Sequence, residues 1–350
     1  MSVLFNKLKL GSLELPNRII MAPLTRCRAG DSRIPNKMMA QYYADRASAG
    51  LIISEATSIC PMGVGYARTP GIWSDEQVSG WKIVTDAVHE KGGRIFLQLW
   101  HVGRISDPIF LEGKQPIAPS AIPPKGYINL VRPKKQFTIP RALELSEIPA
   151  IVAAYRLAAE NAQKAGFDGV ELHGANGYLL DQFLQDSTNK RQDQYGGNIE
   201  NRARLALEVT DAAISVWGSG RVGYHIAPRC DSHDMGDSDP LTIFSYLVEE
   251  LNKRKIAFIF AREAQGDGYI GNKLKDAFNG VYIANQNLSK EDGEKLIENN
   301  YADAVSWGKL FISNPDLVKR FLLNANLNQP NPETFYTEGE IGYLDYEKLA

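Results

Sequence analysis

Short, nearly continuous apolar runs recur along the chain and predict β-strands. Strands covered on both faces are apolar throughout, whereas half-exposed strands alternate between apolar and polar residues. The runs in this chain do not alternate, so we expect parallel strands buried between other layers. The eight runs occupy residues 18–23, 51–56, 94–100, 169–173, 222–226, 257–261, 280–284 and 304–307.

Helical patterns separate most of these runs. Apolar residues recur every three or four positions at 76–91, 147–164 and 199–216. Pro149 near the start of the second pattern and Gly166 just past its end are typical helix boundaries. Eight strands alternating with helices predict an α/β fold, the (β/α)8 TIM barrel. A doubly wound sheet is the alternative, but it would more often carry a glycine-rich phosphate loop after its first strand.

We expect a single domain, residues 1–350, because no Gly/Ser linker or low-complexity segment divides the chain. The longest interruption of the strand–helix rhythm is residues 101–145, which is rich in Pro and Lys. It follows the third strand, on the side where a barrel carries its active site. We interpret it as a lid or excursion subdomain; a surface loop without a role is the alternative.

Composition and charge narrow the function classes. The net charge is −2, from 39 basic and 41 acidic side chains without a block of like charge, which argues against nucleic-acid and membrane-surface binding. No apolar run reaches the roughly 18 residues of a membrane span. The first residues lack the apolar core of a signal peptide, so we expect a cytoplasmic protein. The scattered Cys27, Cys60 and Cys230 disfavour a disulfide framework or a cysteine metal site.

Polar residues gather where the predicted strands end, at the face on which barrels carry their chemistry. They include Arg26, Glu55, Gln98, His101, Arg229, Arg262, Glu263, Asn285 and Lys309. The most informative set is His173, Asn176 and Tyr178, directly after the fourth strand. The first two are suited to bind one oxygen atom, and the phenol is suited to deliver a proton nearby. Helix capping or loop hydrogen bonding is the competing interpretation of this spacing.

Longer segments around these residues point to a family. The longest runs from Gly169 to Leu179 and contains His173, Asn176 and Tyr178. The others are 15–19, 22–26, 53–57, 98–104, 191–197, 201–202, 311–317, 335–336 and 342–346. In this order, and over almost the whole length, they resemble the Old Yellow Enzyme family of flavin-dependent ene-reductases. The fold of that family is a (β/α)8 barrel, in agreement with the strand pattern.

The resemblance implies tightly bound, non-covalent FMN. Pro23, Leu24 and Ala56 match positions that contact the flavin. Thr25 matches a hydroxyl that reaches the flavin O4, and Gln98 matches an amide that bonds the pyrimidine edge. A hydrogen bond donated to the ring stabilises charge on the reduced flavin and so tunes its potential.

The resemblance also implies a substrate site. His173 and Asn176 match the pair that holds the substrate oxygen, with His173 also beside the flavin, and Tyr178 matches the proton donor. Further residues match aromatic positions of the substrate cavity, although ordinary packing explains aromatic residues equally well. They are Tyr66, Trp100 and Tyr336.

The implied reaction is a ping-pong cycle. NADPH or NADH reduces the flavin and leaves, and an electron-poor alkene then enters: an α,β-unsaturated carbonyl, a maleimide or a nitro compound. Hydride from the flavin N5 reaches the β-carbon, and Tyr178 protonates the α-carbon. The sequence does not distinguish NADH from NADPH, nor a monomer from a homodimer.

Three positions of the implied flavin site depart from the usual family pattern. His225 replaces an arginine that faces the flavin, and Asn285, Gln286 and Asn287 replace a glycine-bearing phosphate loop. Lys309 replaces the arginine after Gly308; lysine keeps the charge but loses the bidentate fork. A neutral histidine stabilises a reduced flavin less than arginine does. We therefore expect altered FMN affinity and redox potential.

Two further motifs suggest other chemistry. Residues 266–271 match GxGxxG after a strand, but a short helical stretch follows, so a dinucleotide site is disfavoured. A single loop carries a cluster of acidic residues and one histidine, for which a solvated loop with helix-capping carboxylates is favoured over a metal site. The cluster consists of Asp231, His233, Asp234, Asp237 and Asp239. A metal-dependent barrel lyase or hydrolase and a flavin-free small-molecule binding protein are the alternatives to an ene-reductase. The missing cysteine cluster disfavours the larger iron–sulfur branch of the family.

Overall fold

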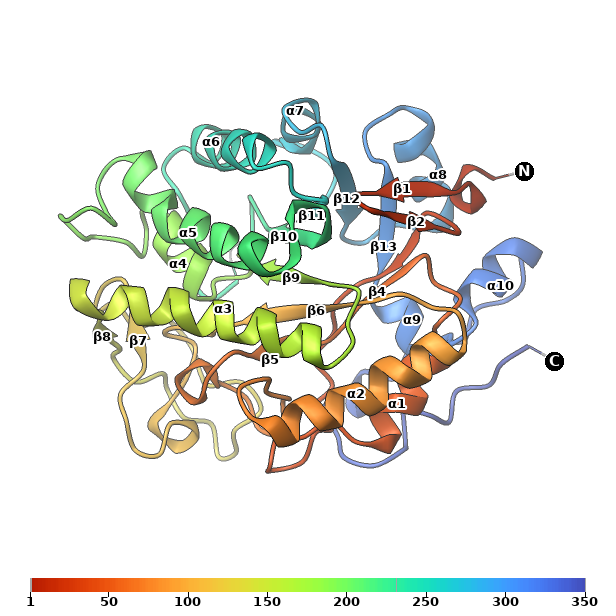
Figure 1. Ribbon diagram of the computed structural model, residues 1–350, viewed down its shortest axis with the longest axis horizontal. Coiled ribbons are helices and arrows are strands. Elements are labelled where there is room, and N and C mark those ends of the chain that lie inside the picture. The colour runs from red at the N-terminus through yellow and green to blue at the C-terminus, as the bar shows by residue number, and fades with distance from the viewer. Residues whose placement is uncertain (1, 231, 350) are drawn as a thin grey trace.

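The computed structural model describes residues 2–230 and 232–349 (Figure 1). Among these residues, eight parallel strands pair in succession, and β13 pairs back onto β3 to close a barrel. The strands are β3 (Ile19–Met21), β4 (Leu51–Ile53), β6 (Ile95–Trp100), β9 (Gly169–His173), β10 (Val222–Ile226), β11 (Phe258–Arg262), β12 (Val281–Asn285) and β13 (Ala304–Trp307). Each coincides with a predicted apolar run, so the predicted (β/α)8 barrel is confirmed.

Helices cover the outside of the barrel. α2 (Asp75–Glu90), α3 (Ile148–Lys164) and α5 (Ile199–Trp217) match the three predicted helices to within one residue at each end. α2 begins at a capping box on Ser74, and α3 has Pro149 in its first turn. The other helices are α1 (Lys37–Ala44), α4 (Leu179–Leu184), α6 (Pro240–Lys253), α7 (Gly271–Asp276), α8 (Lys290–Glu298), α9 (Lys309–Ser313) and α10 (Leu317–Leu323). Within the described ranges, no helix has the length and apolar character needed to cross a bilayer.

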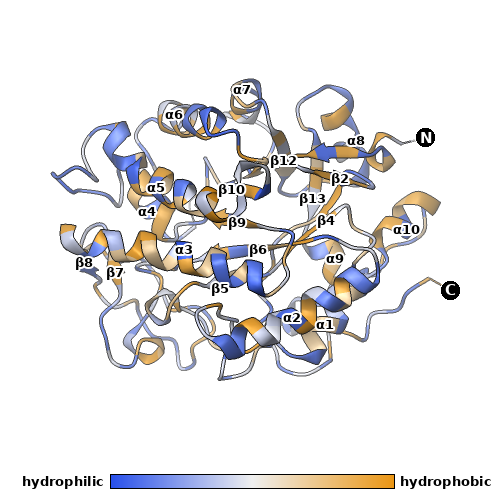
Figure 2. Ribbon diagram, viewed as in Figure 1, coloured by the Kyte–Doolittle hydropathy of each residue, from blue (hydrophilic) through white to orange (hydrophobic). Residues whose placement is uncertain are grey.

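The core has two layers because successive strand residues point to opposite faces of the sheet. Phe96, Phe258, Phe260 and Ile283 belong to the cluster inside the barrel, whereas the intervening residues pack outward against the helices. Figure 2 shows the resulting apolar strands beneath helices of mixed polarity. Gly223 makes room inside the barrel, because a Cβ there would lie 2.1 Å from the Phe258 ring.

A β-hairpin that is not predicted from the sequence closes the end of the barrel where the strands begin. Its strands are β1 (Leu8–Leu10) and β2 (Leu13–Leu15), and their leucines join the inner cluster. Gly11 forms the turn with φ of +54°, and a Cβ there would lie 2.1 Å from the Gly220 carbonyl oxygen. The hairpin therefore caps the bottom of the barrel and leaves the opposite end for the site.

The 101–145 excursion lies at that opposite end (Figure 1). It contains the short parallel strands β7 (Ile117–Ala118) and β8 (Arg141–Ala142), while β5 (Thr57–Ser58) extends the sheet beside β6. The buried carboxylate of Asp107 accepts hydrogen bonds from Lys135 at 2.6 Å and Thr138 at 2.8 Å. The segment thus has internal structure of its own; that it acts as a lid stays a prediction.

Residues 334–343 form a tail that two buried arginines hold against the barrel mouth. Arg26 donates to the carbonyl oxygens of Phe335 at 3.0 Å and Gly342 at 2.7 Å. Arg28 donates to four carbonyl oxygens of the same tail. An aromatic contact also holds the tail, because Tyr343 stacks on Tyr42 of α1 with ring centroids 4.1 Å apart. These contacts bring residue 336 to the end of the barrel where strand β3 terminates.

Candidate active site

A cavity of about 950 Å³ opens at the carboxyl ends of the strands. This volume is at the upper end of the range for small-molecule and cofactor sites. Ten residues predicted for the site line it. They are Pro23, Leu24, Thr25, Asn176, His225, Asn285, Gln286, Gly308, Lys309 and Tyr336. Residues predicted from distant parts of the sequence therefore meet in one space, although their individual roles stay predictions.

The other predicted residues form a layer that adjoins this cavity. The Trp100 ring lies 5.4 Å from Tyr66 and 4.9 Å from Tyr178, measured between centroids. His173 lies 5.0 Å from Tyr178 and stacks on the cavity-lining His225 at 4.9 Å. Ala56 packs with the same aromatic cluster. The two histidines thus connect the predicted flavin residues to the predicted substrate residues.

Both histidines are held neutral. Burial lowers the pKa of His173 to about 3, and the Arg262 charge lowers it further. Burial likewise lowers the pKa of His225 well below its ordinary value, with further contributions from His173 and Arg262. A neutral imidazole donates one hydrogen bond and accepts another, so each ring can bind a ligand oxygen or nitrogen without carrying charge into the site.

Beneath the histidines, the Gln98 side chain lies between His225 and the buried carboxyl group of Glu171. Its Nε2 donates to Glu171 Oε2 at 2.6 Å and lies 3.2 Å from His225 Nδ1. Burial raises the pKa of Glu171 to about 8, so its carboxyl group is neutral at pH 7. The inner floor of the site therefore holds polar atoms but no charge.

Several of these polar atoms are buried without a hydrogen-bond partner among the described residues. They include His173 Nδ1, His225 Nε2 and Glu171 Oε1. Unpaired buried polar groups cost free energy and usually mark a ligand or water position. A flavin ring with donors and acceptors along its edge would pair with such atoms, and Lys309 on the cavity wall would face its phosphate. The residues present therefore fit FMN.

Tyr178 is part of a hydrogen-bonded pair. Its hydroxyl lies 2.9 Å from the Tyr66 hydroxyl, and Asn129 of the excursion donates to Tyr66 at 3.0 Å. Burial raises the pKa of Tyr178 well above 10, and the neighbouring Tyr66 raises it further. The phenol is therefore fully protonated at neutral pH, as a proton donor must be.

Glu171, Asn129 and Phe260 are not among the residues predicted for the site. Glu171 and Phe260 are detectable from period-two alternation, because Glu171 shares the inward face of its strand with His173. Asn129 leaves no such signal, since it reaches Tyr66 through the fold of a long loop.

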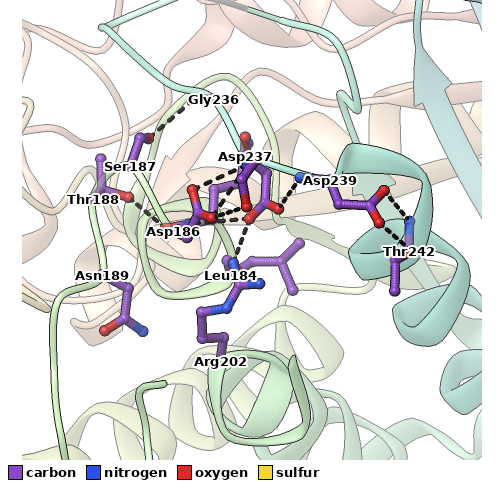
Figure 3. Close-up of polar contacts among 12 residues, drawn as sticks. Leu184, Asp186, Ser187, Thr188, Asn189, Arg202, Gly236, Asp237, Asp239 and Thr242 are labelled. Carbon is purple, nitrogen blue, oxygen red and sulfur yellow. Dashed lines mark hydrogen bonds and ion pairs between the residues drawn. The ribbon is translucent and has the colours of Figure 1, made fainter. Parts of the chain in front are cut away.

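The acidic loop after β10 is a structural anchor (Figure 3). Arg202 forms an ion pair with Asp237, whose side chain is only 1% exposed. Asp237 also accepts from the Asp186 backbone N–H, while Asp239 caps α6 by accepting from Thr242. The prediction of capping is confirmed for Asp239, but the solvated-loop interpretation is wrong for Asp237.

The same loop also holds His233, whose Nδ1 lies 2.7 Å from the Asn176 carbonyl oxygen. Among the residues that the structure describes, no three His, Cys, Asp or Glu side chains are arranged to hold a metal ion. Asp231 lies outside the described residues. The loop of residues 266–271 leads into α7, a helix of six residues.

A closed barrel with a polar, partly unpaired cavity at its mouth has the architecture of a cofactor-dependent barrel enzyme. Comparison with known proteins identifies the cofactor and the chemistry. Residues 3–328 match the NADH:flavin oxidoreductase / NADH oxidase family. The chain belongs to this family and is an FMN-dependent oxidoreductase that takes hydride from a nicotinamide cofactor. The flavin-free and metal-dependent alternatives are not supported.

Individual relatives are similar over nearly the full chain. 12-oxophytodienoate reductase 1 of Oryza sativa subsp. japonica is 44% identical, with 97% of this chain and 92% of the relative covered. A probable flavin mononucleotide-dependent alkene reductase of Leishmania infantum is 44% identical, covering 98% and 97%. The structure of the old yellow enzyme homologue from Zymomonas mobilis superposes with a TM-score of 0.97 at 44% identity, covering 99% of each chain. Morphinone reductase in complex with tetrahydroNAD gives 0.96 at 48% identity, covering 99% and 98%.

Proposed function

We propose that this protein is an ene-reductase for α,β-unsaturated carbonyls, maleimides or nitro compounds. The chemistry that FMN supplies when bound is hydride transfer, from NADH or NADPH to the flavin and then to the β-carbon of the alkene. One observation carries the proposal: the His173 and Tyr178 rings lie 5.0 Å apart beside the cavity that Asn176 lines, and the phenol is protonated. The names of the plant and Leishmania relatives support an alkene as the substrate.

The donor pair would bind the oxygen of the substrate. Asn176 already accepts a hydrogen bond at its Oδ1, so its Nδ2 is the group left to donate. His173 is neutral and can donate without transferring its proton. Fixed donors at an oxygen on which negative charge develops lower the barrier for hydride addition.

Tyr178 would deliver the proton to the α-carbon. Either hydroxyl of the Tyr66–Tyr178 pair can donate to the other. When Tyr66 donates to Tyr178, the Tyr178 proton is free to move toward the substrate. Asn129 holds Tyr66 in this position from the excursion, so we propose that residues 101–145 act as a lid on the proton donor.

A ping-pong order follows if nicotinamide and alkene use the same cavity in turn. The donor pair suits both partners, because a nicotinamide carboxamide and an enone each present a carbonyl oxygen. The tetrahydroNAD complex of morphinone reductase supports nicotinamide binding on this scaffold.

Tyr178→Phe tests the proposal. We expect flavin reduction by NADH or NADPH to stay within about twofold, because that step needs no proton from Tyr178. Reoxidation by 2-cyclohexenone should slow by roughly 10²–10⁴-fold, the usual contribution of a general acid. Anaerobic stopped-flow absorbance at the flavin band measures the two half-reactions separately.

Tyr155→Phe is the matched control. Tyr155 belongs to α3, and its hydroxyl is buried and has no hydrogen-bond partner among the described residues. It should leave both half-reactions unchanged. Equal slowing of both half-reactions in Tyr178→Phe, or unchanged reoxidation, would refute the proton-donor role. A wild-type protein that reduces none of the three alkene classes would refute the function itself.

A further inference from the structure

Arg262 is the last residue of β11 and points into the site. Phe260 and Phe258, two and four residues earlier, face the inside of the barrel, so alternation places Arg262 on the same face at the mouth. It lines the cavity together with Asn176, His225 and Gln286. The proposed reaction gives Arg262 no role.

The guanidinium bonds two neutral amides and no carboxylate. Nη1 donates to Asn176 Oδ1 at 2.8 Å, and Nε donates to Gln286 Oε1 at 3.0 Å. The adjacent Glu263 is bound by Arg229 at 2.5 Å. Within residues 2–230 and 232–349, Arg262 takes part in no ion pair. A cation that is not paired with a carboxylate favours negative charge on a ligand bound beside it.

The contact with Asn176 also determines how that amide is oriented. A guanidinium has only donors, so Asn176 must turn its oxygen toward Arg262 and its Nδ2 away. Asn176 adopts a left-handed backbone with φ of +58°, at the turn after β9. Without Arg262, no other described side chain bonds its Oδ1, and either face of the amide could meet a ligand.

We propose that Arg262 is a positioning residue that fixes Asn176 as a hydrogen-bond donor and places a positive charge beside Asn176 and His225. His225 is neutral, and Arg262 on the neighbouring strand β11 brings a cation to this part of the cavity. The role of Arg262 in binding the substrate oxygen rests on the proposed function. Its charge acts on the flavin whichever substrate the enzyme reduces. Arg262 therefore stabilises the reduced, negatively charged form of FMN and the developing charge on the substrate oxygen.

Three variants of the FMN-loaded enzyme separate the two roles. Arg262→Lys keeps the charge, Arg262→Gln keeps a donor without charge, and Arg262→Met keeps neither. The midpoint potential of the flavin is measured by dye equilibration, and the dissociation constant of cyclohexanone is measured by perturbation of the flavin absorbance. Cyclohexanone is a saturated ketone, so it binds without being reduced.

We expect the Gln and Met variants to lose at least tenfold in relative affinity for reduced over oxidised FMN, which is about 30 mV for a two-electron couple. The Lys variant should keep most of the wild-type potential. The cyclohexanone dissociation constant should rise about tenfold in the Met variant and less in the Gln variant. His225→Arg combined with Arg262→Gln should restore the potential, because it returns one positive charge to the same cavity.

Arg254→Gln, directly after the outer helix α6, is the control for loss of an arginine, since Arg254 pairs with Asp211 at the surface. It should change neither quantity. A potential and a ketone affinity that stay at wild-type values in Arg262→Met would overturn the inference, even if the variant melts earlier. A Lys variant with the potential of the Met variant would overturn the charge role. The flavin potential is measured without an alkene. The test of Arg262 therefore gives a result even if the enzyme reduces none of the three alkene classes.

Discussion

Glu171→Gln tests the electrostatics of the barrel floor. Glu171 is fully buried beside Gln98, and burial raises the pKa of its carboxyl group to about 8 from 4.5. In the unfolded chain the group titrates near 4.5. Between pH 4.5 and 8 the unfolded chain has therefore lost this proton while the folded protein keeps it. Raising the pH through this window favours unfolding, and the effect levels off above pH 8.

The magnitude follows from the two pKa values. Each pH unit in the window costs about 1.4 kcal/mol of unfolding free energy. At pH 7, two and a half units above 4.5, the wild type has lost roughly 3 kcal/mol through this group. Glutamine has nearly the same volume, still accepts from Gln98 and cannot ionise. Glu171→Gln should therefore match the wild type near pH 4.5 and exceed its stability by up to roughly 3 kcal/mol at pH 7.

Urea unfolding of the FMN-free proteins at half-unit steps from pH 5 to 8.5 measures this difference. Glu55 and Asp181 also have raised pKa values, about 7 in each case, but they titrate alike in both proteins and cancel in the comparison. Glu249→Gln, at an exposed position of α6, should run parallel to the wild type. Parallel curves for Glu171→Gln and wild type would refute the reasoning, because Glu171 would then be ionised in the fold.

Three further predictions concern the tail, the cofactor and the lid. Arg26→Met removes the donor to the Gly342 carbonyl group, at about 1–3 kcal/mol, and leaves the Phe335 carbonyl group with Arg28 as its donor. The tail should therefore become sensitive to limited proteolysis and the melting temperature should fall; an unchanged cleavage pattern would contradict this. Lys309→Arg should tighten FMN binding severalfold and Lys309→Met should weaken it, as measured by quenching of flavin fluorescence, and equal dissociation constants would exclude Lys309 from the site. Asn129→Leu should slow reoxidation by 2-cyclohexenone a few-fold and leave reduction by NADH unchanged in stopped-flow measurements; an effect confined to reduction would refute a lid on the proton donor.

The barrel is predictable from sequence because its strands are buried on both faces. Complete burial makes each strand an unbroken apolar run, and the covering helices carry regular stripes with marked ends. The β1–β2 hairpin escapes prediction because each strand has three residues, too few to establish an alternating pattern. Its stability comes from leucines that pack into the far end of the barrel, a contact that no local pattern encodes.

Within the site, predictability depends on how far apart the partners lie. His173, Asn176 and Tyr178 come from one short motif, and the resemblance to a family predicts the remaining flavin contacts. Asp237 is buried because it pairs with Arg202, which lies 35 positions earlier in the chain. The sequence around Asp237 does not show this partner, so the acidic residues there suggest a solvated loop. Asn129 and Tyr66 are 63 positions apart, and only the folded excursion brings them together.

The closure of the barrel between its first and last strands has a consequence for biosynthesis. β3 pairs with β13, and Arg26 bonds the Phe335 carbonyl group across 309 positions of sequence. A ribosome makes Pro23, Leu24 and Thr25 long before Gly308, Lys309 and Tyr336, yet all six line one cavity. If these residues hold FMN as proposed, the nascent chain cannot retain it until almost all of them have emerged from the ribosome. We therefore expect cofactor capture to be a late event, and a ribosome stalled before β13 should hold a chain that remains colourless.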